Sequence, residues 1–150
     1  MARSKQDITT EFTREILRVN LAFKQFLQYK FRQHSVDLTF EMLQVLASLW
    51  NTDGINQQEI ANITVKDKAS MTYLIDNLSR RKLVYRQEDE KDRRNKLIFL
   101  TPQGKALRQQ IQPWVAEMYA VASKDIPVDK ISETMKILEK IRDNMKEYHE

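Results

Sequence analysis

Apolar residues recur at helical spacing along most of the chain, beginning close to the N-terminus. The first stripe consists of Ile8, Phe12, Ile16, Val19, Phe23, Phe26 and Leu27. This spacing predicts an amphipathic helix of about six turns, counted from the 3.6-residue period. Further apolar side chains lie outside the stripe, at Leu17, Leu21, Tyr29 and Phe31. Because one small core cannot cover both sides of a helix, the pattern also predicts a partner surface.

Three shorter helical patterns follow. The stretch LTFEMLQVLASLW predicts a second helix with Thr39 as its N-cap, and NTDG ends it. The stretch INQQEIANIT predicts a short helix capped by Asn56, with Glu59 placed to reach back to the N–H group of the cap. Asp67 is the expected N-cap of a fourth helix. The buried stripe of that helix is Met71, Leu74, Ile75 and Leu78. Its opposite side carries Ala69, Tyr73, Asp76 and Arg80, flanked by Ser70, Thr72 and Asn77.

The charged stretch QEDEKDRRNK, residues 87–96, lies between the apolar runs LVY and LIFL, which belong to the stretches LVYRQ and KLIFL. Their composition is typical of strands, which predicts a β-hairpin with a charged loop. The stretch TPQGKALRQQIQPWVAEMY predicts the next helix, with Thr101 as N-cap, Pro102 in the first turn and Pro113 as a candidate kink. A last helix is expected after Pro127, lined by Val128, Ile131, Met135, Leu138, Met145 and Tyr148.

This order of elements predicts the fold class. A short capped helix, a tight turn and a second helix with a polar outer face form a helix-turn-helix. A strand-loop-strand directly after it makes the assembly a winged helix, in which the charged stretch is the wing. The chain of 150 residues is therefore predicted to be one domain, mainly α with a small β-hairpin wing.

The positive charge is concentrated in one part of the sequence. The net charge is +4, but residues 66–105 contain eleven Lys or Arg and only six Asp or Glu. A basic surface on a nearly neutral body is typical of proteins that dock on a polyanion, and the alternative is a solvated helix face. No apolar run has the length of a signal peptide core or a membrane span, so we expect a soluble, cytoplasmic protein without membrane contact.

The sequence offers little material for catalysis. It contains no Cys, and its histidines are His34 and His149. There is no Ser-His-Asp pattern, and two glycines leave little for a nucleotide-binding loop. We therefore predict that the protein is not an enzyme and holds neither a metal nor a cofactor.

The stretch LIDNLSRRKLVYRQEDEKDRRNKLIFLTPQG resembles the MarR family of bacterial transcriptional regulators, and DRRNKLIFLT matches the wing of that family. The resemblance implies a homodimer built from the N- and C-terminal helices. It also implies two winged helices on a palindromic double-stranded DNA operator, and repression relieved by a small ligand. Lys82 stands where the family usually has Gly, so we expect a left-handed residue there that costs roughly 1 kcal/mol.

The predicted DNA-binding residues come from the fourth helix and the wing. Two groups lie on the helix: the uncharged Ala69, Ser70, Thr72, Tyr73 and Asn77 for base edges and phosphates, and the basic Lys66, Lys68, Arg80 and Arg81 for phosphates. The wing contributes Lys91, Asp92, Arg93, Arg94 and Lys96. The spacing of Asp92 and Arg94 predicts that the carboxylate holds the guanidinium, and the resemblance implies that Arg94 enters the minor groove. The other three acids of the wing, Glu88, Asp89 and Glu90, are expected to face solvent.

The lobe that binds DNA is predicted to be residues 38–101, and residues 1–37 and 102–150 are predicted to form the dimerisation region. The resemblance implies a pocket between these two parts for a small aromatic or other apolar effector, although the sequence assigns it no residues. Two alternatives remain open: a winged-helix adaptor that binds an acidic protein, and a constitutive repressor without an effector.

Overall fold

The computed structural model describes residues 1–149 and divides the chain into two compact units, Met1–Val115 and the residues from Ala116 onward. The first unit begins with α1, Lys5–Gln33. Ser4 and Asp7 cap this helix reciprocally, because each side chain accepts a hydrogen bond from the backbone N–H of the other at 3.1 Å. With 29 residues, α1 is longer than the six turns predicted, since the capping box starts it before the first apolar residue.

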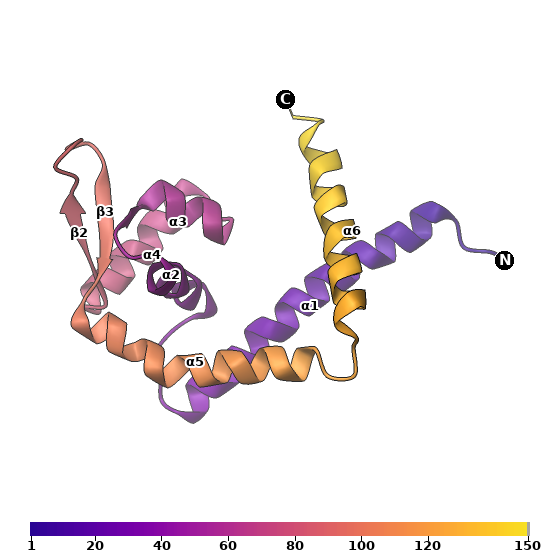
Figure 1. The fold of residues 1–150 in the computed structure, drawn as a ribbon, viewed down its shortest axis with the longest axis horizontal. Helices are drawn as coiled ribbons and strands as arrows, with labels where there is room; N and C mark the ends of the chain where they lie inside the picture. The colour runs from indigo at the N-terminus through magenta and orange to yellow at the C-terminus, as the bar shows by residue number, and fades with distance from the viewer. Residues whose placement is uncertain (150) are drawn as a thin grey trace. The chain divides into compact units, whose positions relative to one another are not determined.

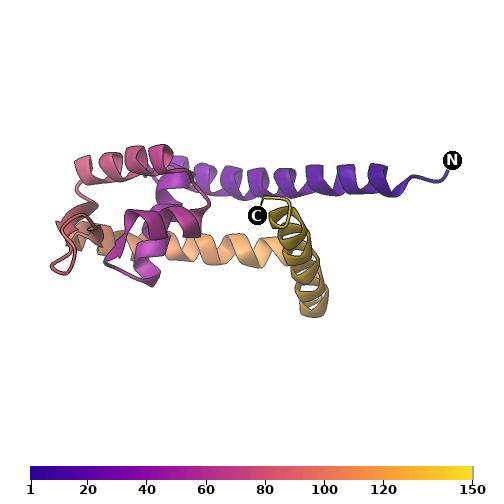
Figure 2. The ribbon, with the colours of Figure 1, turned by 90° about the horizontal axis from the view of Figure 1, so that it is seen from above.

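The lobe lies at the C-terminal end of α1, and α1 extends away from it (Figures 1 and 2). Its helices are α2, Phe40–Asn51, α3, Gln57–Thr64, and α4, Lys68–Arg80. The expected caps are confirmed: Thr39 accepts from the N–H of Met42, and Asn56 accepts from that of Glu59 at 2.8 Å. The reciprocal bond predicted from Glu59 is not formed in the described structure. The fully buried core of the lobe includes Val45, Leu46, Leu49, Ile60, Met71, Ile75, Leu78 and Ile98.

The sheet has one strand more than the predicted hairpin. The strands β2, Val84–Glu88, and β3, Lys96–Leu100, pair antiparallel with Val84 opposite Leu100. A third strand, β1, Ile55–Asn56, pairs with the other edge of β3. Two residues are too few for a strand periodicity to show in the sequence. The hairpin projects beyond the helices of the lobe (Figures 1 and 2), which leaves its loop accessible from several sides.

Lys82 connects α4 to β2 and adopts the left-handed conformation that was expected of it, with φ = 60°. Its backbone N–H donates to Ser79 O at 3.0 Å, and its carbonyl accepts from the Thr101 hydroxyl at 2.7 Å. These bonds fix the strained backbone. The side chain itself is exposed, so it contributes little packing to offset the strain.

Lys82→Gly is therefore expected to raise the free energy of unfolding by ~1 kcal/mol, because glycine has no Cβ to strain at positive φ. Urea denaturation of both proteins measures this change. Lys82→Ala is the matched control, because it removes the same charge but keeps Cβ. Equal midpoints for Lys82→Gly and Lys82→Ala would contradict the explanation.

The helix α5, Pro102–Ala122, begins in the first unit, and its first turn packs closely on the lobe. Thr101 is its N-cap as predicted, accepting from the N–H of Gly104 at 3.0 Å. A Cβ atom on Gly104 would lie 2.1 Å from the Leu83 carbonyl oxygen, closer than any non-bonded contact allows. The Trp50 side chain donates to the Gly104 carbonyl at 2.9 Å. Pro113 is accommodated inside the continuous helix.

Gly104→Ala is expected to lower the free energy of unfolding by about 3 kcal/mol, since the overlapping atom belongs to the backbone and cannot turn aside. Alanine gains only about 1 kcal/mol of helix propensity over glycine, so steric overlap decides the sign. Thermal or urea denaturation tests this. The exposed neighbour gives the control, and Lys105→Ala should be nearly neutral.

The second unit contains the end of α5 and the helix α6, Val128–Lys146. None of the residues of α6 is buried within the described chain. Its large exposed apolar residues include Val128, Ile131, Met135, Ile137, Leu138, Ile141 and Met145. In residues 1–149, every helix is too short or too polar to cross a lipid bilayer.

Candidate nucleic-acid interface

The start of α4 is fixed by Asp67, as the sequence predicts. One carboxylate oxygen accepts from the Ser70 N–H and the other from the Ser70 hydroxyl, both at 2.8 Å. These hydrogen bonds hold the pKa of Asp67 below its usual value. The stabilisation that this carboxylate gives is therefore present above its ordinary pKa and lost as the pH falls through the lowered pKa. The Ser70 hydroxyl proton is consequently committed to the cap.

The outer face of α4 is exposed. Tyr73 is 63% exposed, and its hydroxyl has no hydrogen-bond partner within the described residues. Ala69 and Arg80 are also exposed, and Lys68 is exposed at the first helical position. The structure thus leaves these four predicted side chains available to a ligand in solution.

Asn77 and Arg81 are less available, because they bind each other. The Arg81 Nε donates to Asn77 Oδ1 at 3.2 Å, and the guanidinium forms an ion pair with Asp37 at 2.9 Å. It also donates to the Asp37 carbonyl oxygen. Both side chains are half-buried. They connect the end of α4 to the segment between α1 and α2, and a DNA contact by either remains a prediction.

A second ion pair connects α4 to the sheet. Asp76 lies on the exposed side of α4, and its carboxylate accepts from the Arg86 guanidinium of β2 at 2.6 Å. Arg86 was not among the predicted DNA-binding residues. The two residues are ten positions apart, and only the fold brings this strand beside the helix.

The wing is more ordered than a free charged loop. Asp92 Oδ1 accepts from the backbone N–H of Arg94 at 3.1 Å. The predicted partner residue is therefore right, but the predicted donor, the guanidinium, is wrong. At a spacing of two residues, the backbone N–H is nearer than the end of the long side chain. The expectation that Asp89 only faces solvent is also wrong, because it accepts from the Lys91 N–H at 3.0 Å. The wing cations Lys91, Arg93, Arg94 and Lys96 are all exposed.

Sequence reasoning missed Gln57, the first residue of α3. Its side-chain amide donates to Thr72 Oγ1 of α4 at 2.6 Å. The Thr72 hydroxyl in turn donates to the Lys68 carbonyl oxygen at 3.0 Å. Thr72, a predicted DNA-binding residue of α4, is therefore hydrogen-bonded to α3, the other helix of the helix-turn-helix.

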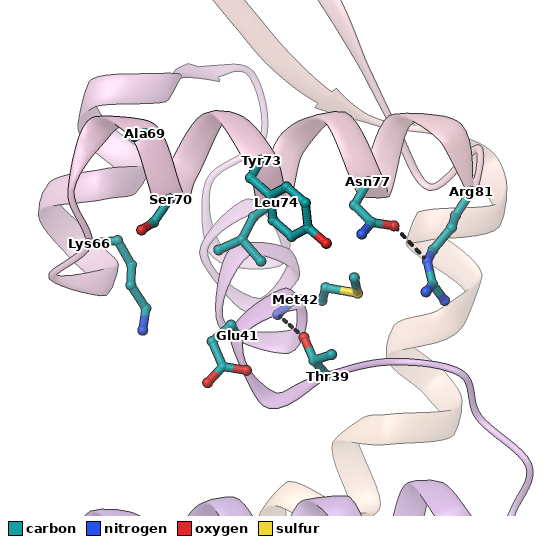
Figure 3. A pocket seen from close by; sticks show the side chains of 10 residues that line it. All are labelled: Thr39, Glu41, Met42, Lys66, Ala69, Ser70, Tyr73, Leu74, Asn77 and Arg81. Carbon is teal, nitrogen blue, oxygen red and sulfur yellow. Dashed lines mark hydrogen bonds between the residues drawn. The ribbon is translucent and has the colours of Figure 1, made fainter.

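A cavity of about 710 Å³ opens between the start of α2 and α4. It is lined by Thr39, Glu41, Met42, Lys66, Ala69, Ser70, Tyr73, Leu74, Asn77 and Arg81. Figure 3 shows Lys66 and Arg81 at opposite ends, with Leu74 and Tyr73 between them on α4. All its lining residues belong to the predicted lobe, so this cavity lies within the lobe and not between the lobe and the dimerisation region.

Glu41 is the one acidic residue in this lining, and its charge is paired. Partial burial raises the pKa of Glu41, but the hydrogen bond from Lys24 of α1 and the charges of Lys24 and Lys66 outweigh burial and hold it below its usual value. The Lys24–Glu41 distance is 2.8 Å. Met42 and Leu74 are apolar members of the lining, and Lys66 and Arg81 lie at its opposite ends.

Residues 38–96, which span the helix-turn-helix and most of the wing, match the sequence model of the MarR family. This part of the chain is similar to the MarR family. The MarR family consists of transcriptional regulators and not of enzymes, which is in line with the prediction that the protein is not an enzyme.

Among curated proteins, the HTH-type transcriptional regulator SarZ of Staphylococcus aureus is 33% identical over 75 residues, which cover 50% of the chain and 51% of SarZ. The chain thus spans about half the length of the curated relatives it matches.

Solved structures cover more of the chain. The transcriptional regulator SlyA superposes with a TM-score of 0.78 at 26% identity, covering 91% of this chain and 94% of SlyA. S. aureus MepR in a DNA-binding conformation also gives 0.78 at 26% identity, covering 89% of this chain and 98% of MepR. A MepR–DNA complex gives 0.74 at 25% identity, covering 95% of this chain and 99% of MepR. These likenesses confirm the predicted winged-helix fold class, with its mainly helical chain and small β wing.

Proposed function

We propose that the protein is a homodimeric, sequence-specific regulator of transcription that binds double-stranded DNA and represses from a palindromic operator. The observation that carries the proposal is the exposed face of α4 beside an ordered wing, with basic side chains on both. The likeness to MepR, which has been crystallised with DNA, supports it. Such a regulator acts in the cytoplasm, where bacterial DNA lies.

In this proposal α4 enters the major groove, whose width admits one helix. Ala69 and Tyr73 meet base edges, because they are exposed, uncharged and outside the intramolecular bonds that occupy Ser70 and Thr72. Lys68 and Arg80 lie near the two ends of the helix, where phosphates flank the groove. They set affinity and its salt dependence, while the uncharged side chains set the choice of sequence.

A second copy of the chain is the proposed partner of α1 and α6. Within the described chain, Leu27 and Phe31 are the only buried residues of α1, while Leu17, Val19 and Leu21 are each at least half exposed. The exposed stripe of α6 continues this pattern of unburied apolar side chains. Apolar surface of this extent is characteristic of interfaces. Two lobes related by a two-fold axis then match a palindrome with half-site centres about 34 Å apart.

The cavity between α2 and α4 is the proposed site for a small aromatic acid that relieves repression. A carboxylate fits beside Lys66 at one end of the cavity, and a ring fits between Met42 and Leu74. Arg81, at the other end, is already paired with Asp37. Its lining includes Tyr73, so ligand and DNA would compete for the same helix face. A thermal shift by such acids, together with loss of DNA binding, tests this step. A DNA-competent protein that no acid shifts would be a constitutive repressor.

Fluorescence anisotropy tests the function itself. The protein is titrated onto the DNA upstream of its own gene and onto a scrambled duplex of equal length, at two salt concentrations. We expect markedly tighter binding to the upstream duplex at both. Equal, weak binding that disappears as salt rises would reject sequence-specific regulation and favour the adaptor for an acidic protein.

A further inference from the structure

A second cleft, of about 320 Å³, lies between α3, the start of α4 and the wing. Its lining includes the cations Lys68, Arg94 and Lys96 and the amide side chains of Asn56, Gln57, Gln58 and Asn95. Among the described residues, no carboxylate lines it. Nor is any of its three cations ion-paired within residues 1–149. The cleft is therefore a concentration of uncompensated positive charge.

The orientation of Gln57 in this cleft follows from Thr72. A hydroxyl has one proton, and that of Thr72 goes to the Lys68 carbonyl oxygen. Toward Gln57, Thr72 Oγ1 can therefore only accept, so the NH₂ end of the amide must face it. One N–H of Gln57 is used in this bond and a second remains to donate. By contrast, the Gln58 amide donates to Asn62 on its own helix.

We infer that this cleft binds a phosphodiester of the DNA backbone, and that Gln57, oriented by Thr72, donates a hydrogen bond to it. The inference rests on the proposed function. If α4 occupies a major groove and the wing the adjacent minor groove, the strand that separates the grooves passes between them. The cleft lies between these two elements, and its charge suits a phosphate better than a base edge.

In this arrangement one phosphate would contact both Lys68 and Lys96, which lie on two different elements. Lys68 is the first residue of α4, and Lys96 is the first residue of β3. A phosphate bound between them would set the depth of the helix in its groove relative to the wing. Because phosphate contacts carry no sequence information, Gln57 should affect all duplexes to the same degree.

The experiment uses the full-length protein and the upstream duplex, with single methylphosphonate linkages placed in turn along one half-site. Gln57→Ala is expected to weaken binding to the operator and to a scrambled duplex by the same factor, about tenfold. Gln57→Glu should weaken both further, because its carboxylate faces the phosphate. Gln109→Glu, an exposed position on α5, makes the same charge change as a matched control.

The decisive result is a non-additive effect of Gln57→Ala and one methylphosphonate linkage on the free energy of binding. There, neutralising the phosphate should weaken wild-type binding strongly and Gln57→Ala binding much less. The slope of log K against log salt should be unchanged for Gln57→Ala and shallower by about 0.9 for Lys96→Ala. Circular dichroism confirms that each variant is folded.

Three outcomes would overturn the inference while leaving the proposed function intact: wild-type affinity of Gln57→Ala, strict additivity at every linkage, or an effect confined to the operator. The last would make Gln57 a reader of bases. If the wild-type protein shows no preference for the upstream duplex, the proposed function fails first and this inference falls with it.

Discussion

A chain that ends before Val128 is expected to be a monomer. Within the described chain α6 buries none of its residues, and its apolar stripe includes Ile131, Met135 and Leu138. If a second copy covers this stripe, its removal takes away most of the area that a stable dimer requires. Light scattering distinguishes the two states, because the full chain of 17.9 kDa should appear at about twice that mass. A truncated chain that stays dimeric would contradict the assignment of α6 to the interface.

Substitution in the intact chain provides a second route to the same result. Ile131→Asp combined with Leu138→Asp places two unpaired carboxylates in the proposed interface, at a cost of several kcal/mol. Lys136→Glu is the control, because Lys136 lies on the opposite side of α6 and is exposed. We expect the double variant to be monomeric and to lose operator binding, and the control to remain dimeric.

Arg94→Ala should fold normally and weaken operator binding by about 1 to 3 kcal/mol, which is roughly 5- to 150-fold. Arg94 is exposed on the wing, and its backbone is held by Asp92, so the side chain is presented in a defined direction. Anisotropy on the operator measures the loss. Asp92→Asn retains an acceptor for the Arg94 N–H and should bind nearly as well as the wild type. Unchanged affinity of Arg94→Ala would remove the wing from DNA recognition.

Local signals in the sequence predicted the elements well. Thr39, Asn56, Asp67 and Thr101 each cap the helix expected of them, because capping requires only a short polar side chain beside the first turn. The buried stripe of α4 follows from the helical period alone. The left-handed residue at Lys82 came from the family resemblance.

The interactions that were missed all join residues distant in sequence or depend on detailed geometry. Arg81 binds Asp37 across 44 residues, and Gln57 binds Thr72 across 15. No periodicity specifies such pairs, because they depend on how α3 and α4 pack. The need for glycine at position 104 appears only when the Leu83 carbonyl is in place. The site residues were predicted from residue type and position, but their intramolecular bonds were not.

The length of α1 has a mechanical consequence. Its 29 residues form a rod of about 44 Å, and among residues 1–149 its buried members are Leu27 and Phe31, near its C-terminal end. If the N-terminal part is held in a dimer, the rod acts as a lever arm. A tilt of about 5° then moves the attached lobe by about 4 Å, which exceeds the 3.4 Å rise of one base pair. A small change in the tilt of α1 at the dimer interface would therefore be enough to move the lobe out of register with its DNA half-site.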